Sequence, residues 1–360
     1  MFNNIIERLL GIKQTTQINH DGYYYSLLSP QQKTIYDAIF QCLNTYSRAA
    51  DILSRPINEI SDIYNSVLKD YPIFFYTTAF NISSSLMSST ATFRPDYKYD
   101  HSTVQRNKDQ ILQYLKRFDF LLNKSELEKE MYVHDYCLEN FQYDYSFSEY
   151  SYTALGPILN KKAVCEGFAK FTKLIFDYLG VQNLIVSGKA NNPAQNSKME
   201  GHSWNIVMLQ GKTYHLDITW DICVTGSAGV PPAKKSNNAG KMPALPVKRY
   251  DYLNLSDDDI KKDHIITEKV PPCTTKGQDY YTKNGMVANN PAELEKMIEK
   301  TLKQGQKHFI VRLNNVTDTN TIVNQILEIA TQKYVNIMNS GVQTNIISNI
   351  NQGVFEICFK

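Results

Sequence analysis

Three residues within about fifty positions of one another could form a thiol-based catalytic site. Cys165 opens the stretch CEGFAKFTKLIFDYLG, His202 lies in GHSWNIV, and Asp217 lies in YHLDITWD. A thiolate is a strong nucleophile, an imidazole can accept and return its proton, and a carboxylate can hold that imidazole in its useful tautomer. These three groups predict acyl transfer through a thioester, provided that the fold brings them together.

Residues 163–180 are predicted to form an amphipathic helix with Cys165 in its first turn. Cys165 shares an apolar stripe with Phe168 and Phe176, which faces a core. A cysteine on such a stripe is often a buried small hydrophobe. However, the first turn also has unpaired backbone N–H groups and the positive end of the helix dipole, which stabilise a thiolate. The helix pattern alone therefore leaves both a nucleophile and a packed thiol open.

Residues 203–220 predict two strands that could place a base beside a carboxylate. The strands are joined at Gln210-Gly211, where glycine suits the positive φ of a tight hairpin. Side chains on one face of a hairpin alternate along each strand. His202 and Asp217 then become diagonal neighbours on the same face, about 7 to 8 Å apart by backbone and within side-chain reach. This is the arrangement that an orienting carboxylate requires.

The same hairpin register offers a second candidate base. It places Thr219 opposite His202 and puts His215 on the same face as Asp217. His202 is preferred because it lies at the start of its strand beside NNPAQNSKMEG, where a groove could open. His215 lies in mid-strand, a position more typical of a packed or supporting side chain. The alternative to a catalytic site is a hairpin with a polar patch and an unrelated buried thiol.

The remaining chain is predicted to form three modules. An N-terminal α+β module spans residues 1–100, a core with its following segment spans 101–285, and a small α/β module spans 286–360. The stretch 225–247, rich in Gly, Pro and Ser, reads as a long surface loop. Predicted helices cover 29–48, 57–68, 104–122, 125–141, 291–302 and 319–333; predicted strands cover IFFYTTAF, SLMSSTATF, NLIVSG, 308–313 and the last residues.

Charge and composition exclude several classes of partner. The chain has 38 Lys plus Arg against 36 Asp plus Glu, a net charge of +2 that gives no general attraction to nucleic acid or an anionic membrane. Its histidines are dispersed, it has no CxxC pair, and SDDDIKKDH suits a helix cap better than a calcium loop, so no metal or cofactor is expected. Without a signal-peptide core or a bilayer-length apolar segment, the protein is expected in the cytoplasm with reduced cysteines. The oligomeric state stays open.

The ordered set AVCEGFAKF, GHSWNIV and YHLDITWD resembles the transglutaminase-like superfamily of bacterial type, over about residues 125–221. This resemblance implies an α+β, papain-like core in which the helix bearing the cysteine packs on an antiparallel sheet. It also implies that Cys165 is the nucleophile, His202 the general base and then acid, and Asp217 the orienting carboxylate. YLNLSDDDIKKDHII and PPCTTKGQDYY are similar to segments that follow this core in bacterial members.

The sequence departs from the family just before the nucleophile. Related sequences tend to read Ser-Ala-Tyr-Gly there, whereas this chain has Leu155 at the Tyr position and Pro157 after the Gly. The backbone N–H of Cys165 is therefore the expected oxyanion donor. Candidates for a second donor or for side chains that support the triad are Tyr152, Trp204, His215 and Trp220.

The expected activity is cleavage of an amide bond in a protein or peptide by a cysteine hydrolase, that is, a peptidase, amidase or deamidase. Hydrolysis is preferred because water needs no dedicated acceptor site, whereas amine transfer does. The alternatives are a transglutaminase, which passes the acyl group to an amine, and a non-catalytic scaffold or binding module. The loops 187–201 and 223–249 are expected to decide between water and an amine.

Overall fold

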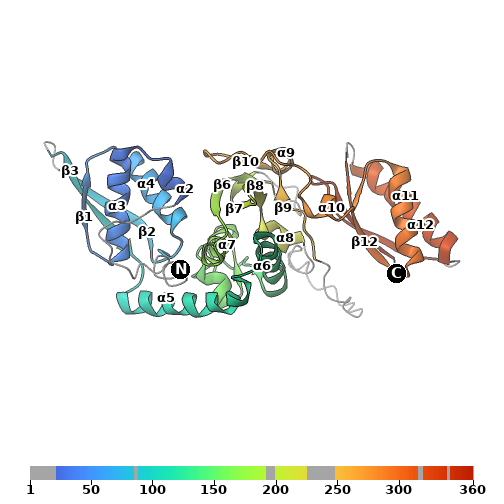
Figure 1. The fold of residues 1–360 in the computed structure, drawn as a ribbon, viewed down its shortest axis with the longest axis horizontal. Coiled ribbons are helices and arrows are strands. Elements are labelled where there is room, and N and C mark those ends of the chain that lie inside the picture. The colour runs from blue at the N-terminus through green and yellow to red at the C-terminus, as the bar shows by residue number, and fades with distance from the viewer. Residues whose placement is uncertain are drawn as a thin grey trace. The chain divides into compact units, whose positions relative to one another are not determined.

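The computed structural model describes residues 22–84, 88–191, 199–224, 248–314, 319–338 and 341–359 (Figure 1). The predicted loop 225–247 and most of NNPAQNSKMEG lie outside the described residues. The chain divides into two compact units, one of residues 1–187 with 203–211 and the other of 188–202 with 212–360. The division into three modules at residues 100 and 285 stays a prediction.

The N-terminal part of the first unit is an α+β structure, as the sequence predicts. Helix α3 begins at Pro30, where Ser29 and Gln32 form a reciprocal capping box. The predicted strand IFFYTTAF begins only at Thr77, and its first four residues are buried without being part of a strand. The elements are α2 Tyr23–Ser26, α3 Pro30–Asn44, β1 Ala50–Leu53, α4 Ile57–Asp70, β2 Thr77–Ser84 and β3 Thr90–Tyr97, with the antiparallel sheet order β1-β3-β2.

A run of helices leads to the cysteine. The predicted helix 104–122 is α5 (His101–Leu115), which tightens into a 3₁₀ helix, η1, over Lys116–Leu121. The next predicted helix is α6 (Glu126–Asn140), capped by Ser125 and Glu128. Short elements follow: β4 Gln142–Tyr143, the π-helical turn η2 Gly156–Asn160, and β5 Lys162–Ala163. Helix α7 (Cys165–Leu179) then begins at the cysteine and ends at Gly180, whose φ of 74° closes the helix.

Helix α7 packs on an antiparallel sheet, so the predicted α+β core is confirmed. Asn205 on the sheet is buried, and its side-chain amide donates to the carbonyl of Ala169 on α7 at 3.1 Å and to that of Leu184 at 3.5 Å. The strands are β6 Asn183–Ala190, β7 Glu200–Leu209, β8 Lys212–Leu216, β9 Leu253–Leu255 and β10 His264–Ile266, in the order β10-β6-β7-β8-β9.

The second strand of the β7–β8 hairpin is shorter than predicted. Its turn is as expected, because Gln210 and Gly211 both have positive φ, 52° and 74°. The sequence predicts a second strand that runs to Trp220, but the strand ends at Leu216 and helix α8 (Ile218–Val224) follows. The predicted pairing of Thr219 with His202 is therefore wrong. The physical reason is that Asp217 caps α8: its Oδ1 accepts the Trp220 N–H at 3.1 Å.

The C-terminal part of the second unit has the predicted order of elements. Helices α11 and α12 pack against each other and against a four-stranded sheet of order β11-β12-β14-β13 (Figure 1). This part has its own core, centred on Ile298, Val311, Ile326 and Phe355. Its elements are α10 Tyr280–Lys283, β11 Val287–Ala288, α11 Pro291–Lys303, β12 His308–Leu313, α12 Thr319–Met338, β13 Thr344–Asn349 and β14 Val354–Phe359. The short helix α9 Asp257–Ile260 contacts β8 and β9 of the core sheet instead. In the described part of the chain, no helix combines the length and the apolarity that a bilayer crossing requires.

Candidate active site

Cys165 is the first residue of α7 and is partly exposed. The residue before it, Val164, is extended and forms the N-cap of the helix. The first N–H groups of a helix have no carbonyl partner within the helix and lie at the positive end of its dipole. Cys165 therefore lies at the start of a helix and is partly accessible to solvent.

The first turn of α7 is held against the chain segment that precedes it. A Cβ atom on Gly167 would lie 2.1 Å from the carbonyl oxygen of Ser151, so only glycine allows this close approach. The same carbonyl accepts the N–H of Val164 at 3.1 Å. The start of the helix, and with it Cys165, is thus positioned by backbone contacts on both sides of the cysteine.

Asp144 in turn fixes the segment that contains Ser151. Its carboxylate accepts the backbone N–H groups of Ser146 and Ser148, both at 2.9 Å, and the hydroxyl of Ser151. Partial burial raises the pKa of Asp144, but these serine hydrogen bonds outweigh it and hold that pKa below its usual value. This support was not predicted from the sequence, although the alternation of Asp and Ser in DYSFSEYS is typical of side chains that bond to nearby backbone.

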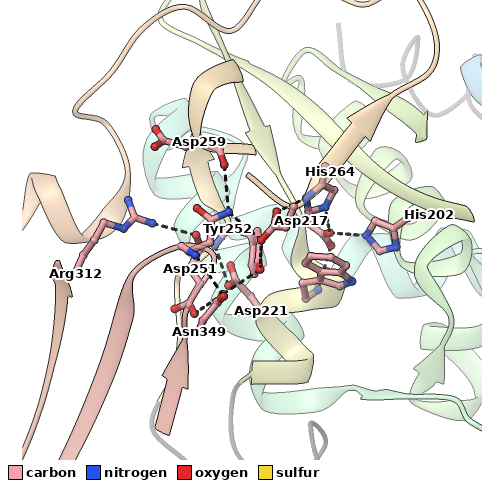
Figure 2. Close-up of polar contacts among 12 residues, drawn as sticks. His202, Asp217, Asp221, Asp251, Tyr252, Asp259, His264, Arg312 and Asn349 are labelled. Atoms are coloured by element: carbon pink, nitrogen blue, oxygen red, sulfur yellow. Dashed lines mark hydrogen bonds and ion pairs between the residues drawn. The ribbon is translucent and has the colours of Figure 1, made fainter. Parts of the chain in front are cut away.

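His202 and Asp217 are hydrogen-bonded to each other (Figure 2). His202 Nε2 lies 2.5 Å from Asp217 Oδ2. The His202 side chain is only 8% exposed and that of Asp217 is fully buried. The other carboxylate oxygen of Asp217 caps α8, so both oxygens have fixed partners. The carboxylate therefore holds the imidazole in one orientation, with Nε2 committed to the aspartate.

A second histidine that sequence analysis missed also contacts Asp217. His264 Nε2 lies 3.1 Å from Asp217 Oδ2, and His264 Nδ1 lies 2.7 Å from Asp263 Oδ1. The Trp220 ring packs beside both histidines, with ring centroids 5.0 Å from His202 and 4.4 Å from His264. Burial raises the pKa of Asp217, but the charge and hydrogen bond of His202, followed by those of His264, outweigh it and hold that pKa below its usual value.

The residues predicted to supply a second oxyanion donor or to support the triad differ in burial and in their contacts. His215 is fully buried and its Nε2 lies 2.9 Å from Asp257 Oδ1; burial lowers the pKa of His215 against the opposing effect of that carboxylate. Trp204 on β7 is almost completely buried. The Tyr152 side chain is about half exposed, and its backbone carbonyl accepts the Lys170 ammonium at 3.2 Å. Trp220, another of these candidates, lies against His202 with ring centroids 5.0 Å apart.

Three groups of side chains among the described residues have the geometry to hold a metal ion. In each group the possible ligand atoms lie within 4.8 Å of one another. Each also contains a histidine and a carboxylate that already bond to each other, at 2.5, 2.9 and 3.0 Å, and this contact accounts for their arrangement without an ion. The expectation that no metal is needed stays a prediction. The groups are His202, Asp217 and His264; His215, Asp257 and Cys273; and His308, Glu356 and Cys358.

The thiols should differ sharply in reactivity. We expect iodoacetamide at pH 6 to alkylate Cys165 at least about tenfold faster than Cys358, since both are partly exposed but only Cys165 begins a helix. Cys42 and Cys137 should react more slowly still, because burial raises the pKa of both thiols. Timed quenching followed by peptide mass spectrometry measures each rate. Equal rates at Cys165 and Cys358 would argue against an activated thiol.

Comparison with known proteins bears on the region that holds these residues. A family model described as Transglutaminase-like superfamily matches residues 120–218. Among solved structures, a candidate cysteine protease of Cytophaga hutchinsonii is similar at 13% identity, with a TM-score of 0.25, over 39% of this chain and 61% of that one. A structure described as a TGase is similar at 18% identity, with a TM-score of 0.26, over 47% of this chain and 54% of that one.

The chain thus spans less than two-thirds of either of these two proteins. No curated protein matches it. The family match begins before α6 and ends just after Asp217, so it contains the helix that starts at Cys165 and the strand of His202. Residues 120–218 of this chain are therefore a transglutaminase-like superfamily domain.

Proposed function

We propose that Cys165, His202 and Asp217 catalyse acyl transfer at amide bonds through a thioester, and that water releases the acyl group. The observation that carries this proposal is the buried 2.5 Å contact between His202 Nε2 and Asp217 Oδ2. It occurs in a transglutaminase-like domain that also presents a partly exposed cysteine at a helix start. An imidazole that a buried carboxylate already orients loses little entropy when it transfers a proton.

The His202 contact defines which ring atom would carry the proton. Because Nε2 bonds to Asp217, Nδ1 is the nitrogen that exchanges a proton with the thiol and the leaving group. In the first half-reaction the Cys165 sulfur attacks the amide carbon and forms a C–S bond. The C–N bond then breaks as His202 Nδ1 gives its proton to the departing amine. The products of this step are a thioester on Cys165, a free amine and a neutral imidazole.

The second half-reaction uses the same groups in reverse. His202 Nδ1 takes a proton from water, and the water oxygen attacks the thioester carbon. Collapse of the tetrahedral intermediate breaks the C–S bond, releases a carboxylic acid and regenerates the thiolate beside the imidazolium. The backbone N–H of Cys165 is the proposed donor to the oxyanion in both halves, and Tyr152 is a candidate for the second donor.

One experiment separates hydrolysis from its alternatives. The protein and its Cys165→Ala variant are incubated with a peptide library, with and without a primary amine, and ammonia release, cleavage and amine incorporation are followed by mass spectrometry. We expect products of hydrolysis that require Cys165, whether or not the amine is present, because water needs no acceptor site. A Cys358→Ala variant, which removes another partly exposed thiol, is the matched control.

Two outcomes would contradict the proposal. Amine incorporation that outpaces hydrolysis would assign the chain to amine transfer. The same products from the Cys165→Ala variant, or none from either protein across the library, would favour a binding module built on the same fold.

A further inference from the structure

The carboxylate of Asp217 is shared by two histidines from different strands. His202 Nε2 and His264 Nε2 lie 2.5 and 3.1 Å from the same oxygen, Oδ2. His264 belongs to β10, which pairs with β6, and its side chain is completely buried. A buried carboxylate is costly unless hydrogen bonds satisfy it, and here one oxygen has two imidazole partners. The position of Oδ2 thus depends on His264 as well as on His202.

His264 is itself held on its other side. Its Nδ1 lies 2.7 Å from Asp263 Oδ1, so the ring bridges two buried aspartates. Each ring nitrogen of His264 therefore lies within hydrogen-bond distance of a carboxylate oxygen. Rotation of the ring would break these contacts.

Asp263 connects this ring to the last strands of the chain. Its Oδ2 accepts the Tyr252 hydroxyl at 2.9 Å and the Gln352 side-chain amide at 3.1 Å. The amide of Asn349 donates to the Tyr252 oxygen at 3.0 Å and to Asp251 Oδ2 at 3.0 Å. All these residues are buried. An unbroken series of hydrogen bonds therefore leads from Asn349 and Gln352 through Asp263 and His264 to Asp217. Figure 2 shows Asn349, Tyr252, His264 and Asp217 in this region.

At the end of this series farthest from Asp217, the residue Asp251 is held by two arginines. Arg249 forms two hydrogen bonds with the Asp251 carboxylate, at 3.0 and 2.7 Å. Arg312 on β12 donates to the Asp251 carbonyl at 3.2 Å and forms an ion pair with Asp279 at 2.6 Å. A bidentate arginine contact of this kind is geometrically strict. Arg312 thereby links β12 to the segment that precedes β9 through its hydrogen bond to the Asp251 carbonyl.

We propose that His264 is a positioning residue for Asp217 and that the C-terminal strands hold His264 in place through Gln352 and Asp263. The proposal rests on the proposed role of the His202–Asp217 pair. The proposal also gives the C-terminal strands a role, which is to support the side chain that positions Asp217. Asn349 ends β13 and Gln352 follows in the turn to β14, so this hairpin supplies the outermost support of the orienting carboxylate. His264 acts through Asp217 rather than on a substrate.

The first test replaces His264 by glutamine in protein that also carries Cys165→Ala. The readout is the low-field proton resonance of the His202 Nε2–H bonded to Asp217, assigned by its absence in His202→Gln. We expect this resonance to shift or disappear in His264→Gln, because Oδ2 loses a donor that fixes it. His308→Gln, which changes another histidine paired with a carboxylate, should leave the resonance unchanged. An unchanged resonance in folded His264→Gln would overturn the proposal.

The second test begins at the C-terminal end and also covers a His264 variant that does not fold. Gln352→Met removes the amide donor to Asp263 at nearly constant size, and Gln304→Met is the exposed control in the same part of the chain. We expect the His202 resonance to shift in Gln352→Met by less than in His264→Gln. The control should match the parent protein. A resonance that Gln352→Met does not move would remove the C-terminal strands from the proposal.

Activity gives an independent measure when Cys165 is intact. We expect His264→Gln to lower kcat by about 10- to 100-fold with little change in KM, because a displaced proton carrier slows chemistry more than binding. For Gln352→Met, we expect a loss of about threefold. A change confined to KM would contradict a positioning role. If the parent protein hydrolyses no amide, the proposed function fails while the resonance still decides whether His264 positions Asp217.

Discussion

Replacing Cys165 by alanine should abolish turnover of an amide substrate, with a loss of about 10⁴-fold or more in kcat, because the attacking atom is removed. The fold should survive, since alanine suits a first helical turn and the cysteine is only partly buried. Steady-state kinetics measures the loss. Intact-protein mass spectrometry of a rapidly quenched reaction should show an acyl adduct on the parent protein that the variant lacks.

The controls separate the nucleophile from a merely accessible thiol. Cys358→Ala should retain the parent kcat and the acyl adduct, because Cys358 lies on β14 and not at the start of α7. Thermal unfolding of each variant checks that the fold is intact. An acyl adduct on Cys358, or a Cys165→Ala protein that turns over at the parent rate, would disprove the assignment of the nucleophile.

The proximity of His202 and Asp217 could be predicted because a two-residue turn sets the hairpin register. Gln210 and Gly211 adopt the expected positive φ, which fixes which residues of β7 and β8 lie opposite one another. The prediction nevertheless extends the second strand too far. Asp217 is also a typical helix N-cap residue. It caps α8 through the Trp220 N–H, so the chain forms a helix after Leu216 and does not continue the β-strand.

His264 could not be found in this way, since its strand reaches the site through a distant pairing. β10 pairs with β6 with His264 opposite Ala190, and a long segment separates these strands in the sequence. No tight turn relates their registers, so alternation along the chain does not show which side chain meets Asp217. The clearest local feature of the sequence was the adjacent pair Asp263 and His264. This pair does not indicate that His264 contacts Asp217.

Helix positions were predicted well where a cap marks the helix start. Ser29 and Ser125 form the capping boxes of α3 and α6, and Asn290 caps α11 with Pro291 in its first turn. The aromatic stretch 73–76 was predicted as strand because aromatic residues favour strands, yet in this fold the same residues are buried outside any strand. Aromatic residues are expected in a buried segment whether or not it is a strand, so the residue types at 73–76 could not distinguish these two structures.

Asp217→Asn should lower kcat by about 10³- to 10⁴-fold, because the asparagine amide can force the wrong tautomer on the imidazole. Asparagine can still cap α8 with its carbonyl oxygen, which then directs its NH₂ group toward the two histidines. His202 Nε2 must then accept a hydrogen bond, so Nδ1 carries the proton and can no longer take one from the Cys165 thiol. Kinetics measures the loss. Asp257→Asn, which changes the carboxylate paired with His215, is the matched control.

The same substitution should destabilise the fold in a pH-dependent way. The pKa of Asp217 is lowered in the folded protein, where the charge and hydrogen bond of His202 and the contacts of His264 outweigh burial. Its contribution to stability is therefore present at neutral pH and is lost as the pH falls toward the folded-state pKa. Thermal unfolding should show a deficit of about 2 kcal/mol for Asp217→Asn at pH 7 that shrinks at acidic pH. A deficit that grows in acid, or a kcat no lower than that of Asp257→Asn, would mean that Asp217 is not the ionised partner of His202.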